Sequence, residues 1–373
     1  MPVTKAAFRV SGLPDPGFDG LEIDLGPTHP STAGLLWGTI VWDGDTVDSI
    51  DAQPGALHRG AEVIMAARNY RQALGLANRH DWQAPFFGEW ALARLVEDAL
   101  GVDVPERARW IRVALAEHTR VASHLAYLSF VGHHQGDARL ATHGVRELLR
   151  ERTAELTGNR LHPMAVRLGG IACEPTQAWV AAERDTLEEA SRLAERIAEA
   201  IEGWGVGVAL VSRANVDAYG LAGPVARASG VSTDLRLSRP DAAYTTCADL
   251  LCVDAPTTGD AHARFRHLAA EVVASAAIVG RVLDGLPGGP LVAHLPKVVK
   301  LPEGDWTASV EAPLGRAGVV VTSRGEKTPW RLRLRTASFA HVSAWPAVLP
   351  GTGADDLELA MASLPWVAGD LDK

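Results

Sequence analysis

The stretch HRGAEVIMAARNYRQALGLANRHDW, from His58 to Trp82, is the segment around which the other parts of the sequence are arranged. It opens with a His-Arg-Gly turn, continues as one helix-like segment and closes on a second polar cluster that runs from Asn78 to Asp81. Cationic side chains at both ends of a helix suit a site that holds a buried anion or a redox centre. The alternative interpretation is a capped and solvated surface helix.

Other stretches with distinctive motifs follow one another along the chain. They are LGPTHPSTAGLLWG (25–38), VPERARWIRVALAEHTRVASHL (104–125), TGNRLHPMAVRLGG (157–170), LAGPVARASGVSTDLR (221–236) and EAPLGRAGVVVTSRGEKTPWRLRLRTASFAH (311–341). The last four residues, DLDK, look like an Asp-x-Asp-Arg ending. With these motifs the sequence resembles the quinone-site subunit of respiratory NADH:quinone oxidoreductase (complex I). This is the 49 kDa or D-type subunit, a relative of nickel-iron hydrogenase large subunits.

The pattern of apolar and turn residues divides the chain into β-rich ends and a helical middle. We expect a single α+β domain over residues 1–373, with a β-rich part (1–56), a helical core (57–203), a mixed and helical part (204–309) and a C-terminal β part with a tail (310–373). Asp43-Gly44 predicts a hairpin turn, and Gly101 predicts the end of a helix. The resemblance implies a hydrogenase-large-subunit-like fold, a central helical bundle flanked by N- and C-terminal β elements.

Composition excludes several classes of function. A net charge of −9 argues against a nucleic-acid-binding protein, which would carry a basic face. No apolar run reaches the ~18–20 residues that cross a bilayer, and the N-terminus lacks the apolar region of a secretory signal. We therefore expect a peripheral protein, held at the cytoplasmic face of the cell membrane through partner subunits. No GxGxxG or P-loop motif predicts NADH or ATP binding by this chain.

The cysteines bear on the relation to hydrogenases. Cys173, Cys247 and Cys252 form no CxxC pair, and they are expected to be structural thiols. Hydrogenases of this group hold nickel and iron with two CxxC pairs, and the positions of the first pair correspond to Asp81 and Ala84. The final segment LPWVAGDLDK also contains no cysteine. Because these soft thiolate ligands are missing, we expect no bound metal and no hydrogenase activity.

The resemblance places four residues around the quinone headgroup: His29, Ala33, Trp82 and His134. In the family the loop that contains His29 carries a second His, whose position is Ala33 here. Trp82 stands where the family has a Tyr, and its indole can donate a hydrogen bond but has no phenolic proton to transfer. His134 stands where an Asp pairs with the second His. The alternatives are a loop-ordering role for His29, simple packing for Trp82 and a surface position for His134.

Three further residues match the family on the side that faces the terminal iron–sulfur cluster of a partner subunit: Arg59, Arg79 and His162. Cations beside an anionic cluster stabilise its reduced state. The alternative for each Arg is an internal ion pair with Glu62 or Asp81. Elsewhere, a line of residues three and four positions apart on one helix face predicts structural salt bridges; it comprises Glu117, Arg120 and His124.

The function implied by the resemblance is that of a subunit of proton-translocating NADH-quinone oxidoreductase. The chain itself would bind no cofactor; quinone would be the substrate, the iron–sulfur cluster would lie in a partner subunit, and NADH would bind at a distant subunit. The implied partners are the iron–sulfur B-type subunit, the C-type subunit and the membrane H-type subunit. The alternative is a paralogue that acts as a structural or assembly subunit or serves another acceptor, because the headgroup positions are Ala33 and Trp82.

Overall fold

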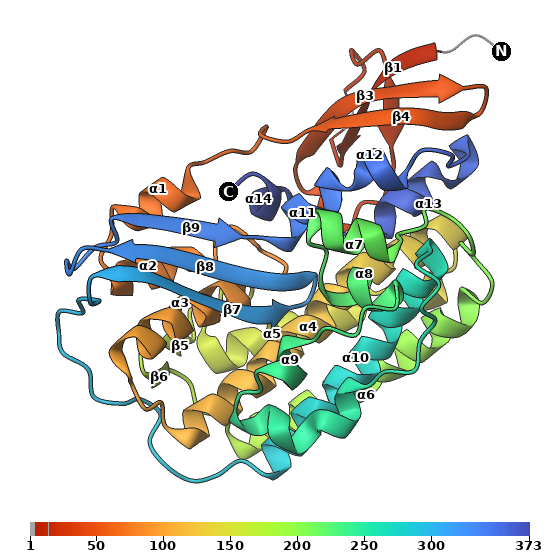
Figure 1. The fold of residues 1–373 in the computed structure, drawn as a ribbon. Helices are drawn as coiled ribbons and strands as arrows, with labels where there is room; N and C mark the ends of the chain where they lie inside the picture. The colour runs from red at the N-terminus through yellow and green to blue at the C-terminus, as the bar shows by residue number, and fades with distance from the viewer. Residues whose placement is uncertain (1–3, 14) are drawn as a thin grey trace.

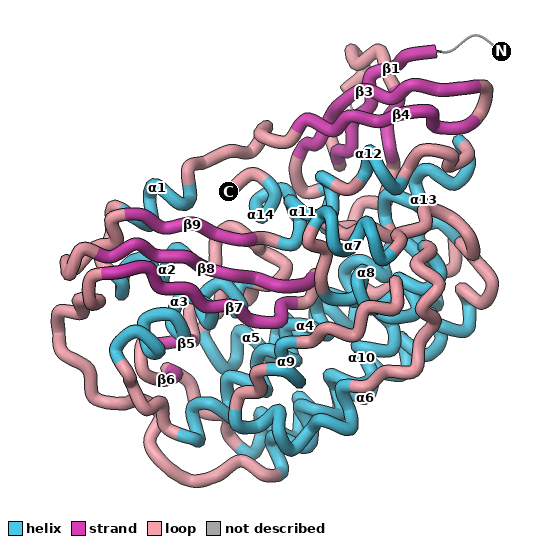
Figure 2. Tube along the Cα trace, in the orientation of Figure 1, coloured by secondary structure: helices cyan, strands magenta, loops and turns pink. Residues whose placement is uncertain are grey.

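The computed structural model describes residues 4–13 and 15–373, with the backbone alone for residue 242. A bundle of long helices carries a β-sheet from the C-terminal part of the chain, and a second sheet from the N-terminal part packs on the short helix labelled α12, Trp345–Val348 (Figure 1). Figure 2 shows the two sheets as separate magenta layers, with the helices gathered beside and below them. The predicted α+β class, with a helical middle between N- and C-terminal β elements, is confirmed.

The N-terminal sheet has the strand order β2-β1-β3-β4. Its strands are β1 (Thr4–Ser11), β2 (Leu21–Ile23), β3 (Leu35–Asp43) and β4 (Thr46–Gln53). Strands β1 and β2 are parallel, whereas β1–β3 and β3–β4 are antiparallel. The predicted hairpin turn after β3 is confirmed, because Gly44 adopts a left-handed conformation with φ 67°. Between β2 and β3 lies a short 3-10 turn, η1 (Pro30–Thr32), which belongs to the candidate site.

The segment from His58 to Trp82 forms two short helices, α1 (Ala61–Ala66) and α2 (Tyr70–Ala77), so the prediction of one continuous helix is wrong. The break has a local cause in Asn69, which is extended and caps α2. The Asn69 side chain accepts a hydrogen bond from the Gln72 backbone, and the Gln72 side chain accepts one from the Asn69 backbone. This capping box begins a new helix within a continuous apolar pattern.

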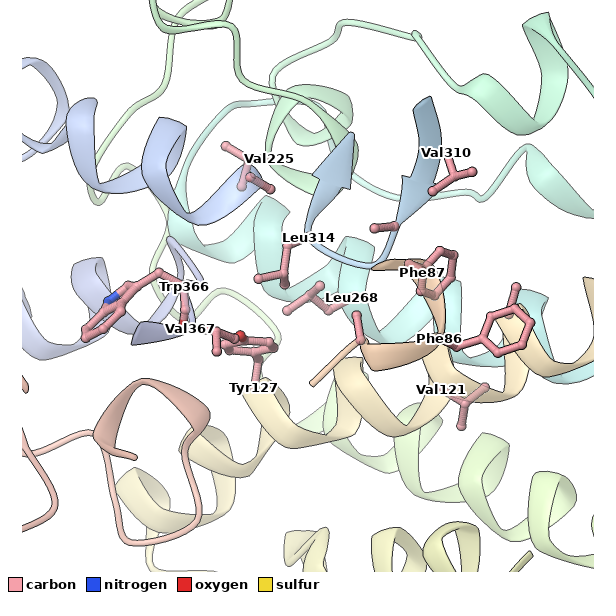
Figure 3. Packing of buried hydrophobic residues seen from close by; sticks show 14 of the residues in the cluster. Phe86, Phe87, Val121, Tyr127, Val225, Leu268, Val310, Leu314, Trp366 and Val367 are labelled. Carbon is pink, nitrogen blue, oxygen red and sulfur yellow. The ribbon is translucent and has the colours of Figure 1, made fainter. Parts of the chain in front are cut away.

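The long helices are α3 (Pro85–Leu100), α4 (Glu106–Gln135), α5 (His143–Thr157), α6 (Gln177–Ala200) and α10 (Ala261–Asp284). Helix α3 ends at Gly101 in a left-handed conformation with φ 62°, as predicted. Helix α4 lies at the centre and contacts α5, α6 and α10. The core between α4, α10 and the C-terminal sheet is filled by apolar side chains, among them Phe87, Leu268 and Leu314 (Figure 3).

The region between the long helices contains more regular structure than its glycines and prolines predict. A two-stranded hairpin of β5 (Val166–Arg167) and β6 (Gly170–Ile171) interrupts the part predicted to be helical. Short helices α7 (Arg213–Tyr219), α8 (Gly223–Ala228) and α9 (Leu235–Ser238), with the 3-10 segment η3 (Ala242–Leu251), occupy the stretch predicted as mixed loop. These elements are too short for a hydrophobic period to reveal them.

The C-terminal sheet has the antiparallel order β7-β8-β9 and packs on α3 and α1. Its strands are β7 (Gly304–Ala312), β8 (Gly315–Ser323) and β9 (Arg331–Arg335). The chain then forms α11 (Ala337–Ser343), α12 (Trp345–Val348), η4 (Ala354–Asp356), α13 (Leu357–Ala362) and α14 (Ala368–Leu371). Residues 363–372 are buried, so the tail is part of the core. Within the described ranges, the structure contains no helix whose length and hydropathy would let it cross a bilayer.

Candidate functional site

Three chain segments bring together the residues predicted to face a partner's cluster. An Nη2–H group of Arg59 lies 3.4 Å from the backbone oxygen of Arg79. Nδ1 of His162 donates to the backbone oxygen of Asn78 at 3.0 Å. The Arg79 guanidinium reaches Met164 Sδ at 3.7 Å. The turn before α1, the end of α2 and the loop before β5 therefore place both guanidinium groups and the imidazole in one region.

Both arginines of this region are exposed at the surface. Within the described residues, no carboxylate lies within salt-bridge distance of Arg59 or Arg79. Glu62 instead accepts the Leu334 backbone N–H at 2.8 Å, and Asp81 accepts the N–H groups of Gln83 and Ala84. The alternative of internal ion pairs with Glu62 or Asp81 is thus not what the structure shows.

His162 is half-buried near Arg79. Partial burial and the Arg79 charge lower the pKa of His162 from its ordinary value, so its imidazole is neutral near pH 7. A neutral imidazole that already donates from Nδ1 keeps Nε2 as its proton-accepting atom. The region therefore combines two guanidinium groups that form no salt bridge with a described residue and an imidazole that is able to take up a proton.

His29 is buried at the start of η1, where it caps the 3-10 turn. Its Nδ1 accepts the Ser31 backbone N–H at 3.3 Å, which places the ring hydrogen on Nε2. Nε2 is buried and has no hydrogen-bond partner among the described residues. Burial, and secondarily the Arg146 charge, lower the pKa of His29 to about 3. His29 orders its loop as a neutral ring, packed edge-on against Tyr127 with ring centres 5.3 Å apart.

Ala33 and His134 lie outside the buried part of the site. Ala33 is exposed at the end of η1, where its N–H donates to the Pro30 oxygen. His134 is exposed in the last turn of α4 and packs on Phe130 and Trp204, with ring centres 5.4 and 5.1 Å away. His29 contacts the same Phe130 ring. The two histidines therefore lie around one aromatic side chain, one buried and one exposed.

Trp82 is partly buried between the arginine region and a small cavity. The Arg59 guanidinium lies 5.8 Å from the centre of its ring. A Cβ atom on Gly369 would come within 2.3 Å of Trp82 Cζ3, so the C-terminal tail passes directly against that ring edge. Nε1, on the opposite edge of the indole, is buried without a hydrogen-bond partner among the described residues. Trp82 thus lines the cavity and carries a buried donor with no partner among the described residues.

A buried acidic cluster beside Trp82 escaped the sequence analysis. His80 Nδ1 lies 3.1 Å from Asp370 Oδ1, and the Ser338 N–H donates to Asp370 Oδ2 at 3.2 Å. Burial and the Asp370 charge raise the pKa of the neighbouring Asp81 to about 7. For Asp370 burial acts in the same direction, but the hydrogen bond from His80 outweighs it and lowers its pKa. The DLDK motif contains Asp370, but only the fold shows that it meets His80.

The residues Glu117, Arg120 and His124 on α4 belong to a fully buried ionic network. Glu117 pairs with Arg120 at 3.0 Å, which confirms that part of the predicted salt-bridge line. His124 pairs instead with Glu271 of α10, with Nε2 and Oε2 2.8 Å apart. Glu271 also binds Arg227 of α8 at 2.5 Å. The network joins distant elements rather than lining one helix face.

Comparison with known proteins agrees with this architecture. Residues 138–300 and 294–373 match the family described as respiratory-chain NADH dehydrogenase, 49 Kd subunit. The second of the D-type NADH-quinone oxidoreductase subunits of Salinispora tropica is 41% identical, over 95% of this chain and 93% of that protein. The first D-type subunit of Streptomyces coelicolor is 39% identical over the full length of both.

A solved structure is similar over almost the whole chain. It comes from the membrane-bound sulfane sulfur reductase (MBS), an archaeal respiratory membrane complex, with a TM-score of 0.84 and 28% identity. The match covers 93% of this chain and 97% of that one. Together with the family match and the full-length relatives, this shows that the chain belongs to the 49 kDa (D-type) family of respiratory-chain NADH dehydrogenase subunits.

Proposed function

We propose that this chain forms one wall of the electron-acceptor site in a respiratory NADH:quinone oxidoreductase of the proton-translocating type. A partner's iron–sulfur cluster would supply the electrons, and quinone would be reduced between the two subunits. The observation that carries the proposal is the pair of exposed guanidinium groups of Arg59 and Arg79 near His162, neither of which forms a salt bridge with a described residue.

These cations support a role in setting the energy of a neighbouring reduced centre. A positive charge a few ångströms from an anionic cluster favours its reduced form, by ~1 to ~4 kcal/mol at 4 Å as the effective dielectric falls from that of water to that of a protein surface. Neutral His162 can accept a proton when negative charge accumulates beside it. The chain would thus stabilise an added electron and couple it to a proton.

The test replaces one cation in the assembled complex. Arg79→Gln should make the reduction potential of the adjacent cluster more negative, by roughly 40 mV per kcal/mol of lost interaction for a one-electron couple. Redox titration followed by electron paramagnetic resonance measures this. Arg192→Gln, which removes an exposed arginine of α6 paired with Glu188, is the matched control. An unchanged potential in Arg79→Gln and Arg59→Gln would refute the cluster-facing assignment.

A second candidate function is electron transfer to an acceptor other than quinone, or a purely structural role in the complex. It is favoured by the exposed methyl group of Ala33 and by the position of His134, which is packed on Trp204 at the helix end. The similar chain in MBS belongs to a complex named as a sulfane sulfur reductase, so this fold also occurs in a complex that reduces sulfur.

Quinone reductase activity separates the two candidates. NADH-dependent quinone reduction is compared in complexes with and without this chain, and in a triple variant with Ala33→His, Trp82→Tyr and His134→Asp. If the acceptor differs from quinone, the parent complex is slow and the triple variant is faster. A parent complex that reduces quinone at full rate would eliminate the second candidate.

The remaining parts of the proposal concern assembly. We propose that the chain is peripheral on the cytoplasmic face of the membrane and is held there by a membrane H-type subunit. The iron–sulfur B-type subunit would cover the region of Arg59 and Arg79, and a C-type subunit would complete the set. NADH would bind at a distant subunit. Support comes from the family and from the free cationic region.

A further inference from the structure

A cavity of about 60 Å³ lies beside Trp82, between α4 and the following helix α5. Trp82 forms one side, and Ala122 of α4 contributes to the wall. The opposite side is rich in arginine, with Arg146 and Arg150 on α5 and Arg160 in the loop that follows. Arg160 is exposed and Arg146 is buried, so the cavity runs from the surface towards the interior.

Arg146 is a buried cation that has no counter-ion among the described residues. Its side chain is 7% exposed, and its one described hydrogen bond goes from Nη1 to the Thr28 oxygen at 3.2 Å. No carboxylate forms a salt bridge with it in the part of the chain that the structure describes. Burial, together with the Arg150 charge, lowers the pKa of Arg146 to about 10, which leaves it charged near neutral pH. Burying an unpaired charge is costly unless something compensates it.

The other charged side chains that line the cavity are also mostly cationic. Arg150 and Arg160 share one carboxylate, that of Glu147. His118, which also lines the cavity, is already engaged by Glu183 at 2.7 Å and by Thr153 at 2.9 Å. Three arginines therefore line the cavity, two of them share one carboxylate, and the buried third forms no salt bridge with any described residue.

Trp82 adds a directional donor to these charges. Its indole Nε1 is buried and has no partner among the described residues, although buried polar groups are normally hydrogen-bonded. The far edge of the ring is fixed against Gly369, so the indole cannot easily turn away. An occupant that accepts a hydrogen bond and carries negative charge would satisfy both Trp82 and Arg146.

The volume limits the size of such an occupant. One water needs roughly 10–15 Å³ of space for its centre, so about 60 Å³ admits roughly four to six water-sized atoms. An anion built of one central atom and a few oxygen or sulfur atoms fits this space, whereas the ring and substituents of a quinone headgroup exceed it. The planar, multiply donating guanidinium is also well suited to an oxyanion.

We propose that this cavity binds a small inorganic oxyanion of sulfate or thiosulfate type, held by the Arg146 guanidinium and the Trp82 indole N–H. The site is additional to the acceptor wall of Arg59, Arg79 and His162, and it requires neither quinone nor a partner's cluster. Its occupant would lie next to the position at which the family places the headgroup-contacting side chain.

The test is direct binding to the purified full-length chain. Sodium sulfate and sodium thiosulfate are titrated by calorimetry against sodium chloride at equal ionic strength. The expected result is one saturable site for at least one oxyanion and none for chloride. Trp82→Phe keeps an aromatic ring but removes the N–H, and should weaken binding about five- to tenfold. Arg146→Gln should weaken it at least tenfold.

Two further variants separate this site from general anion attraction and from failure to fold. Ala122→Leu fills the cavity without changing any charge and should abolish binding, while Arg192→Gln removes an exposed arginine elsewhere and should leave it unchanged. Circular dichroism verifies folding of each variant. The proposal would be overturned if the parent bound no oxyanion. It would also be overturned if Trp82→Phe and Ala122→Leu bound the oxyanion as tightly as the parent does. Neither result would affect the cluster-potential test.

Discussion

Asp81 is a mostly buried carboxyl group whose protonation changes within the physiological range. Burial and the neighbouring Asp370 raise its pKa to about 7, well above the value in an unfolded chain. Between those two pKa values the folded state binds more protons than the unfolded state. The free energy of unfolding therefore decreases as pH rises from about 4 to about 7 and reaches its lower level above pH 7.

Asp81→Asn is expected to remove this dependence. The Asn side-chain oxygen can still accept the Gln83 and Ala84 N–H groups, so the local turn is retained. Relative to the parent, the free energy of unfolding of the variant should rise by about 2–3 kcal/mol from pH 5 to pH 8, and its relative Tm by a few degrees at the higher pH. Thermal unfolding at both pH values measures it. Asp217→Asn, at an exposed position on α7, is the control, and parallel pH profiles for parent and Asp81→Asn would contradict the assignment.

For single residues, the sequence predicts which side chains belong to the candidate site better than it predicts the partners that surround them. The resemblance selected Arg59, Arg79 and His162, which the structure brings together, and it showed that Ala33 and Trp82 depart from the family pattern. It could not show that Arg146 lacks a counter-ion or that His80 meets Asp370. Such contacts depend on tertiary packing. His80 and Asp370, for example, are 290 positions apart in the sequence.

The buried ionic network connects helices α4, α8, α9 and α10 with strand β7. Glu271 of α10 is its common acceptor, bound by His124 at 2.8 Å and by Arg227 at 2.5 Å, while Arg236 approaches it to 3.6 Å. Burial alone would raise the pKa of Glu271, but the Arg227 charge outweighs it and holds the pKa well below the usual value. The charges of the network compensate one another only as a set.

Glu271→Gln keeps the shape of the side chain and leaves the arginines of the network short of one negative charge. Breaking a buried pair from one side is expected to lower the free energy of unfolding by ~3–5 kcal/mol. Urea unfolding followed by tryptophan fluorescence measures the change. Glu188→Gln, in an exposed pair with Arg192, should alter it by no more than ~0.5 kcal/mol. Similar losses in both variants would show that the network contributes no special stability.

Elements with a strong local signal were predicted well, and elements defined by tertiary contacts were not. The hairpin at Gly44 and the helix end at Gly101 follow from backbone conformations that favour glycine. The break between α1 and α2 was missed because the apolar pattern runs through it and only the Asn69–Gln72 capping box marks it. The β5–β6 hairpin has two residues in each strand, too few to produce an alternating pattern.

The C-terminal tail holds the parts of the whole molecule that form the site. The Trp366 oxygen accepts hydrogen bonds from Ser31 Oγ at 2.7 Å and from Tyr127 at 3.3 Å, and Figure 3 shows Trp366 and Tyr127 on neighbouring segments. The Asp372 carboxylate accepts the N–H groups of Gly55 and Leu57 at 2.7 and 2.8 Å. The tail thus joins the His29 loop, helix α4 and the turn before Arg59.

Removing residues 366–373 is expected to loosen these connections while the long helices remain. Hydrogen–deuterium exchange should increase at residues 26–33 and 55–60, because their buried contacts and hydrogen-bond acceptors are lost. Helix α6 serves as the internal control and should exchange as in the parent. Asp372→Asn should increase exchange only at residues 55–57. Unchanged exchange at residues 26–33 after truncation would show that the tail does not order the His29 loop.

The position of this tail also orders events during biosynthesis. Residues 363–372 leave the ribosome after every other segment of the site, so a nascent chain exposes the His29 loop and the Arg59 turn before they are fixed. A partner that recognises the finished surface must therefore wait until residues 363–372 have been synthesised and packed.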